Sequence, residues 1–89
     1  MKRIYKYKLD VCDKQKVVLP MEAQILKAGM QGSCLYIWAF VDPDEKSTME
    51  RTICIFGTGH EVAGNVDDLV HIETIFVGDL VFHIFESFE

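Results

Sequence analysis

Hydrophobic and polar residues alternate along much of this chain with the period of two that is typical of β-strands. The clearest case is residues 4–9, where tyrosine and leucine occupy one face and two lysines the other. This pattern predicts a strand with one buried and one exposed face. With the other β-prone runs, the pattern predicts strands at Ile4–Leu9, Lys16–Leu19, Gln24–Gln31, Cys34–Val41, Arg51–Phe56, Leu69–Val77 and Leu80–Glu86.

Short turns separate most of these runs. Residues 21–28 include good helix formers, but glycines follow so closely that we favour a strand over Gln24–Gln31. The pairs Gly32-Ser33 and Gly78-Asp79 are typical of two-residue hairpin turns. We therefore predict an all-β fold over residues 1–89, a single domain built as a small antiparallel barrel or sandwich of six or seven short strands.

The Gly78-Asp79 turn also predicts a register for the last hairpin. Thr74 would lie opposite His83, and His71 opposite Glu86. In this register the two histidines lie on opposite faces and cannot share a metal ion. A cluster of His71 with Glu73 and Glu86 is either a solvated strand end or a pH-sensitive group.

Two predicted strands, Cys34–Val41 and Leu80–Phe85, are apolar on both faces. A domain of this size buries only about 60–65% of the surface of its unfolded chain. We therefore expect a homo-oligomer, in which a second copy covers part of the apolar surface. Core packing is the alternative role for the interface candidates, which are Tyr36, Trp38, Phe40, Phe82 and Phe85.

Composition narrows the class of protein. Apolar residues make up 49% of the 89 positions, which excludes intrinsic disorder, and the formal net charge is −5. Because an acidic chain repels phosphates, we expect no direct nucleic-acid binding. No apolar run approaches the roughly 18 residues of a membrane helix, and the charged start is unlike a signal peptide. The three cysteines have no CxxC spacing, so a reducing cytoplasm is expected.

One local motif could carry chemistry. In Gly57-Thr58-Gly59-His60, successive backbone N–H groups could form an anion-binding nest, with Thr58, His60 and Arg51 as further donors. A sharp turn after the preceding strand explains the same residues. The chain has no nucleophile elbow, no HExxH and no His-x-His spacing. We therefore predict a protein that is not an enzyme and uses no cofactor or metal ion.

Several short blocks together resemble a known pattern. They are Ile4-Tyr5-Lys6-Tyr7, Leu19-Pro20, Trp38-Ala39-Phe40-Val41-Asp42-Pro43, Gly57-Thr58-Gly59-His60 and Gly78-Asp79-Leu80-Val81-Phe82-His83. Nearly the whole chain resembles an uncharacterised family of proteins of about this length from tailed phages and bacterial prophage regions. It departs from that family at Glu22, where the relatives tend to have glycine, and in its Phe88-Glu89 extension.

The resemblance implies a phage-encoded accessory protein in the cytoplasm of an infected bacterium. It implies no particular biochemical activity. The favoured function is non-catalytic inhibition of a host component, such as one of antiviral defence. The alternative is sequestration of a nucleotide-like signal between subunits, with phosphate at residues 57–60 and the base on Trp38 or Tyr36. An enzyme that uses His60 or His71 is the weakest of the three hypotheses.

Overall fold

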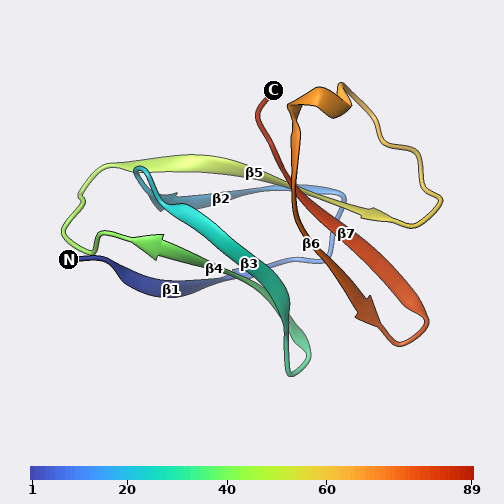
Figure 1. Ribbon diagram of the computed structural model, residues 1–89, viewed down its shortest axis with the longest axis horizontal. Helices are drawn as coiled ribbons and strands as arrows, with labels where there is room; N and C mark the ends of the chain where they lie inside the picture. The colour runs from blue at the N-terminus through green and yellow to red at the C-terminus, as the bar shows by residue number, and fades with distance from the viewer.

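The computed structural model describes all residues 1–89 and contains two antiparallel sheets that face each other (Figure 1). Sheet A has the strand order β1-β4-β3, and sheet B has the order β2-β5-β7-β6. The sheets form an open sandwich rather than a closed barrel, which confirms the predicted all-β class. The strands are β1 (Arg3–Leu9), β2 (Lys14–Pro20), β3 (Gln24–Gln31), β4 (Cys34–Val41), β5 (Thr48–Gly57), β6 (Leu69–Val77) and β7 (Leu80–Ser87).

The one helical segment is a single 3-10 turn, η1 (Val66–Asp68). Asn65 caps it, because its side-chain oxygen accepts a hydrogen bond from the Asp67 N–H group. The structure contains no helix with the length and apolar character needed to cross a membrane.

The observed strands agree with the predicted ones to within one residue at each end, except in β2 and β5. Both are longer than their hydrophobic runs, because they pair over seven residues from Lys14 opposite Cys54 to Pro20 opposite Thr48. Backbone pairing thus brings polar flanking residues into the sheet. Pro20 lacks an N–H group and is tolerated at the end of an edge strand.

The core lies between the inner faces of the two sheets. β4 contributes every second residue to it, and Leu35, Ile37, Ala39 and Val41 are almost completely buried. Sheet B contributes Ile53, Ile55, Ile75 and Ile84. The other residues of β4 point outward. This strand is apolar on both faces, and the chain itself covers only its inner face.

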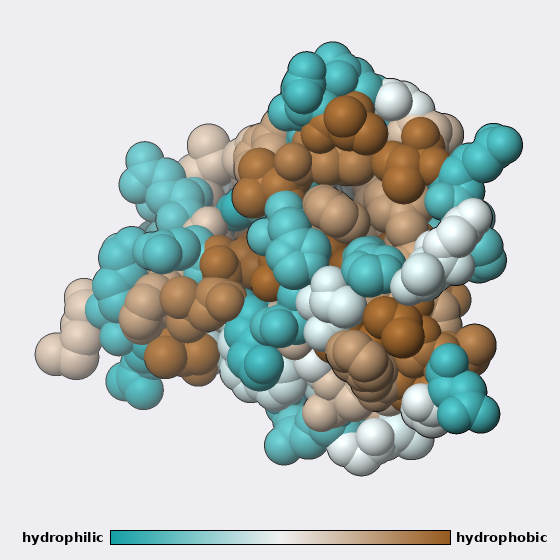
Figure 2. Space-filling view, turned by 45° about the vertical axis from the view of Figure 1, so that its right-hand side comes forward, coloured by the Kyte–Doolittle hydropathy of each residue, from teal (hydrophilic) through white to brown (hydrophobic).

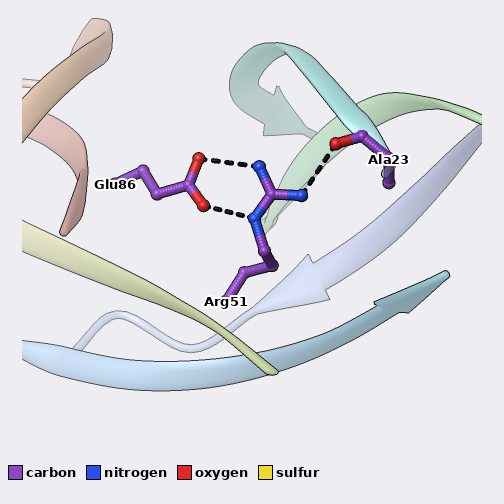
Figure 3. Close-up of polar contacts among 3 residues, drawn as sticks. All are labelled: Ala23, Arg51 and Glu86. Atoms are coloured by element: carbon purple, nitrogen blue, oxygen red, sulfur yellow. Dashed lines mark hydrogen bonds and ion pairs between the residues drawn. The ribbon is translucent and has the colours of Figure 1, made fainter. Parts of the chain in front are cut away.

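A buried ion pair lies on the inner face of sheet B (Figure 3). Arg51 on β5 donates from Nε and Nη2 to the two carboxylate oxygens of Glu86 on β7. Its Nη1 donates to the carbonyl oxygen of Ala23 at 2.7 Å. Ala23 lies in the connection from β2 to β3, so Arg51 ties sheet B to the segment that enters sheet A.

A β-bulge interrupts the last hairpin. Gly78 has φ +60, as its turn requires, and Thr74 lies opposite His83 as predicted. The register then shifts between His71 and Glu73, so His71 lies opposite Phe85 instead of Glu86. The predicted pairing of His71 with Glu86 is therefore wrong, because one extra residue turns His71 to the outer face of sheet B.

Glu22 adopts a left-handed conformation with φ 63 and is the only non-glycine residue with a positive φ. Because a side chain with a Cβ is strained there, we expect Glu22→Gly to raise the free energy of unfolding by about 1 kcal/mol. Urea denaturation measures the difference. The matched control is Gly32→Ala at φ +62, which should lower the free energy of unfolding by a similar amount. A destabilised Glu22→Gly variant would contradict this account.

Candidate functional site

The outer face of sheet A carries a row of three aromatic side chains. Tyr36, Trp38 and Phe40 alternate with buried residues on β4, and all three are partly exposed, Phe40 at 37%. The rings of Tyr36 and Trp38 lie 5.9 Å apart at an interplanar angle of 54°. β4 is the central strand of its sheet, with hydrogen-bonded neighbours on both sides. The backbone therefore holds this aromatic row in fixed positions.

Lysines from β1 lie beside the aromatic row. Lys6 pairs with Trp38 and Lys8 with Tyr36 in the β1–β4 register. The Nζ atom of Lys6 lies 4.5 Å from the centroid of the Tyr36 ring, in cation–π contact, and donates to Gln31 at 2.7 Å. Trp38 and Phe40 have no such cation over their rings, so their ring faces are more available to a ligand than the ring face of Tyr36.

The β3 side of the row is more open. Gly29 pairs with Tyr36, and a Cβ atom placed on Gly29 would lie 3.8 Å from Cζ3 of Trp38. The indole therefore extends toward a position that has no side chain. Lys27, opposite Trp38, directs its Nζ to the Glu73 carboxylate on β6 at 3.4 Å, which partly neutralises its charge.

Charge is distributed unevenly between the sheets. The strands of sheet A contain no aspartate or glutamate and carry a charge of +4 from Arg3, Lys6, Lys8 and Lys27. The rest of the chain holds five basic and all fourteen acidic residues, a charge of −9. The total of −5 therefore hides a basic sheet, and the charge of the strands of sheet A differs in sign from that of the whole chain.

The outer face of sheet B carries a hydrogen-bonded row of two histidines and two threonines. Nε2 of His71 lies 2.9 Å from the hydroxyl of Thr74, which lies 3.0 Å from Nδ1 of His83. Nε2 of His83 lies 2.7 Å from the hydroxyl of Thr58. Sequence reasoning missed this row because it placed the histidines on opposite faces, and nothing in the residue order marks the bulge.

The chemistry of this histidine–threonine row follows from its partners. A hydroxyl 2.7 Å from an imidazole nitrogen has the geometry of a nucleophile and its base. The other nitrogen of His83 meets a hydroxyl, however, where a carboxylate would stabilise the imidazolium ion. No three His, Cys, Asp or Glu side chains converge as ligands for a metal ion. The hydrogen bonds of the histidine–threonine row fix the orientation of its own four side chains on the outer face of sheet B.

Residues 57–60 do not converge as the anion nest requires. The Thr58 N–H group already donates to the Val81 carbonyl and the His60 N–H group to that of Gly57. The Thr58 hydroxyl points outward to His83, whereas the His60 ring packs over Gly57, where an added Cβ atom would lie 2.8 Å from it. Gly59 makes a turn at φ +88. The fourth proposed donor, Arg51, is committed to Glu86 in the core.

The predicted interface residues occupy three different surfaces. Tyr36, Trp38 and Phe40 share the outer face of sheet A. Phe82 packs against the core between the sheets. Phe85 lies on the outer face of sheet B, with its ring 5.8 Å from that of Phe56 and 5.2 Å from that of His71. The structure therefore brings together only the three residues of the aromatic row.

A pocket of about 260 Å³ lies beside the outer face of sheet B. Cys54 and Phe56 on β5 line it, together with Gly64, Asn65 and Leu69. Burial raises the pKa of the Cys54 thiol, an effect that Lys14 opposes and Glu89 reinforces. The thiol is thus held in its less nucleophilic protonated form. Its setting is that of a small hydrophobe.

Comparison with known proteins gives one match. No curated protein and no solved structure matches the chain. A family model described as "Domain of unknown function (DUF7352)" matches residues 1–89. The resemblance to an uncharacterised family is confirmed to that extent, since the match spans every strand of both sheets. The chain belongs to this DUF7352 family.

Proposed function

We propose that this protein is a non-catalytic binding protein whose contact surface is the outer face of sheet A. One observation carries the proposal: the aromatic row is exposed in the middle of a sheet that contains no acidic residue. Aromatic side chains dominate the binding energy of many interfaces, because they bury a large area with few rotatable bonds. Here the central strand of a three-stranded sheet presents them, which lowers the entropy lost on binding.

We further propose that the protein acts as a phage-type accessory protein in the cytoplasm of an infected bacterium, where it inhibits a host component such as one of antiviral defence. The motif resemblance described above supports this context. Sequestration of a nucleotide-like signal is the alternative. Its phosphate could not lie at residues 57–60 while its base stacks on Trp38 of the same subunit, because the two sites occupy different faces.

A homo-oligomer is part of the proposal, and the outer face of sheet B is the surface that fits it. The outward residues of β5, β6 and β7 include Phe56, Phe76, Val81 and Phe85, and the only charged one is Glu50, at the end of β5 that pairs with Val18 of β2. Phe76 is 75% exposed. Figure 2, with the β6–β7 side turned forward, shows hydrophobic patches at the surface between hydrophilic groups. Two copies can bring the β6–β7 parts of such faces together without charge repulsion, whereas paired sheet A faces would bring two positively charged surfaces together.

Two surface variants test the proposal, because they separate the two faces. In a pull-down from a nuclease-treated bacterial extract, the wild type and Phe76→Glu should retain the same protein, and the Trp38→Ala/Phe40→Ser double variant should lose most of it. Light scattering should show an oligomer for the wild type and the double variant. Phe76→Glu should be a monomer, because a carboxylate cannot be buried unpaired in the contact.

Val18→Glu is the matched control for Phe76→Glu. Val18 is 56% exposed on β2, at the other edge of sheet B. Its substitution should change neither the protein captured in the pull-down nor the oligomeric state measured by light scattering. Equal capture by the wild type and the aromatic-row variant would overturn sheet A as the contact surface. A monomeric wild type at micromolar concentration would overturn the oligomer.

A further inference from the structure

We propose that the outer face of sheet A binds single-stranded nucleic acid, with bases stacked on Trp38 and Phe40 and phosphates held by Lys6 and Lys8. The inference rests on the proposed function, since it takes the same face as the contact surface, and it assigns a nucleic-acid ligand to that face in addition to the protein partner. Single-stranded binding sites combine aromatic stacking platforms with a positively charged track for the backbone. Both parts are present here on neighbouring strands.

The spacing of the aromatic row fits a series of bases. Residues two apart on a strand are separated by about 6.8 Å, which is twice the spacing of about 3.4 Å between stacked bases of one DNA strand. An extended single strand can therefore place successive unstacked bases on successive rings. Lys6 already covers the Tyr36 ring. Trp38 and Phe40 are then the two open platforms, with Gly29 leaving space beside the indole.

The charges lie where the backbone of such a strand would run. Lys6 and Lys8 project from β1 on the same face as the row, one opposite Trp38 and the other opposite Tyr36. On the other side, Lys27 is paired with Glu73. The phosphates are thus expected along β1 at Lys8 and over the Tyr36 ring at Lys6, whose Nζ reaches across that ring to Gln31 on β3. The whole-chain charge led to the opposite expectation, no nucleic-acid binding, but the acidic residues lie outside the strands of this sheet.

Other occupants fit this face less well. A second copy would place Lys6 and Lys8 against the same lysines, a repulsive arrangement. A free mononucleotide would gain only one stacking contact, because the row lies on an open face and none of its residues lines a pocket. A polymer repeats the contact at each ring, so its affinity rises with length. An acidic protein segment shares the charge but not the stacking.

Fluorescence anisotropy with a labelled fifteen-residue oligothymidylate tests the inference. Trp38 is the only tryptophan, so quenching of its emission reports stacking directly. We expect binding that Trp38→Ala weakens at least about fivefold. We also expect a roughly sevenfold loss of affinity between 50 and 200 mM salt for two neutralised phosphates. Lys8→Ala should reduce that salt dependence, and Lys16→Ala, an exposed lysine on sheet B, should leave it unchanged.

Three results would overturn the inference. The first is the absence of oligothymidylate binding at 50 mM salt. The second is equal affinity of the protein for thymidine monophosphate and for the oligothymidylate. The third is full displacement of the oligothymidylate by polyglutamate, with no quenching of Trp38 emission. Any of these leaves the proposed function intact if the pull-down from nuclease-treated extract still depends on the aromatic row. Loss of that dependence while the oligonucleotide still binds would instead reject a protein partner and keep the nucleic-acid site.

Discussion

Replacement of Arg51 by methionine is expected to lower the free energy of unfolding by about 3–5 kcal/mol. The side chains of Arg51 and Glu86 are only 13% and 8% exposed, so the Glu86 carboxylate would remain in the core without its partner. The carbonyl oxygen of Ala23 would lose a donor as well. Domains of this kind are stable by about 5–15 kcal/mol in total, so this single change would remove much of the stability.

The double variant Arg51→Met/Glu86→Leu is the control for this prediction. When both charges are replaced by apolar side chains of similar volume, no buried charge is left unpaired, and the stability should return close to that of the wild type. Urea denaturation followed by circular dichroism measures all three proteins. A loss of less than about 1 kcal/mol in Arg51→Met would show that water or another donor reaches the carboxylate.

Truncation of Ile37 to alanine is expected to lower the free energy of unfolding by about 2–5 kcal/mol. Ile37 is fully buried at the middle of β4, with Tyr7 of β1 and Ala28 of β3 as its cross-strand neighbours. Ala28 is too small to fill the cavity that the truncation leaves. The loss therefore includes a cavity term in addition to the lost transfer free energy.

Ile37→Val should cost only about 0.5–1.5 kcal/mol, because it removes one methylene group. Val18→Ala, at an exposed position on the outer side of β2, should change the stability by no more than about 0.5 kcal/mol. The same denaturation experiment compares the three variants. If Ile37→Ala and Val18→Ala had equal effects, the assignment of Ile37 to the center of the core would be wrong.

The strands could be predicted from the sequence because each depends on a local alternation. Parity along a strand also carries information about Arg51. It shares a face with Ile53 and Ile55, as Glu86 does with Ile84. Extending the alternation to these two residues would have placed opposite charges in the core and predicted their pairing. The predicted ligand role of Arg51 did not use this parity, and the structure pairs its side chain with Glu86 instead.

Other features could not be read from the sequence. The bulge beside His71 leaves Ile72 of β6 without a cross-strand partner and packed against the core, and no residue of the hairpin marks that position in the sequence. The uneven charge was present in the sequence but appears only when strands are grouped by sheet. The first strand and the β3–β4 hairpin, which β2 separates in the chain, make up the acid-free sheet.

The order of pairing between strands has a consequence for biosynthesis. Only two of the strand pairs, β3 with β4 and β6 with β7, are hairpins joined by two-residue turns. β1 can pair only after β4 has been synthesised, and β2 only after β5 has been synthesised. On the ribosome the basic first strand therefore remains unpaired until residues 34–41 have emerged. Loop-closure entropy delays these distant pairings, so the hairpins form early and the N-terminal strand docks onto a partner that is already in place.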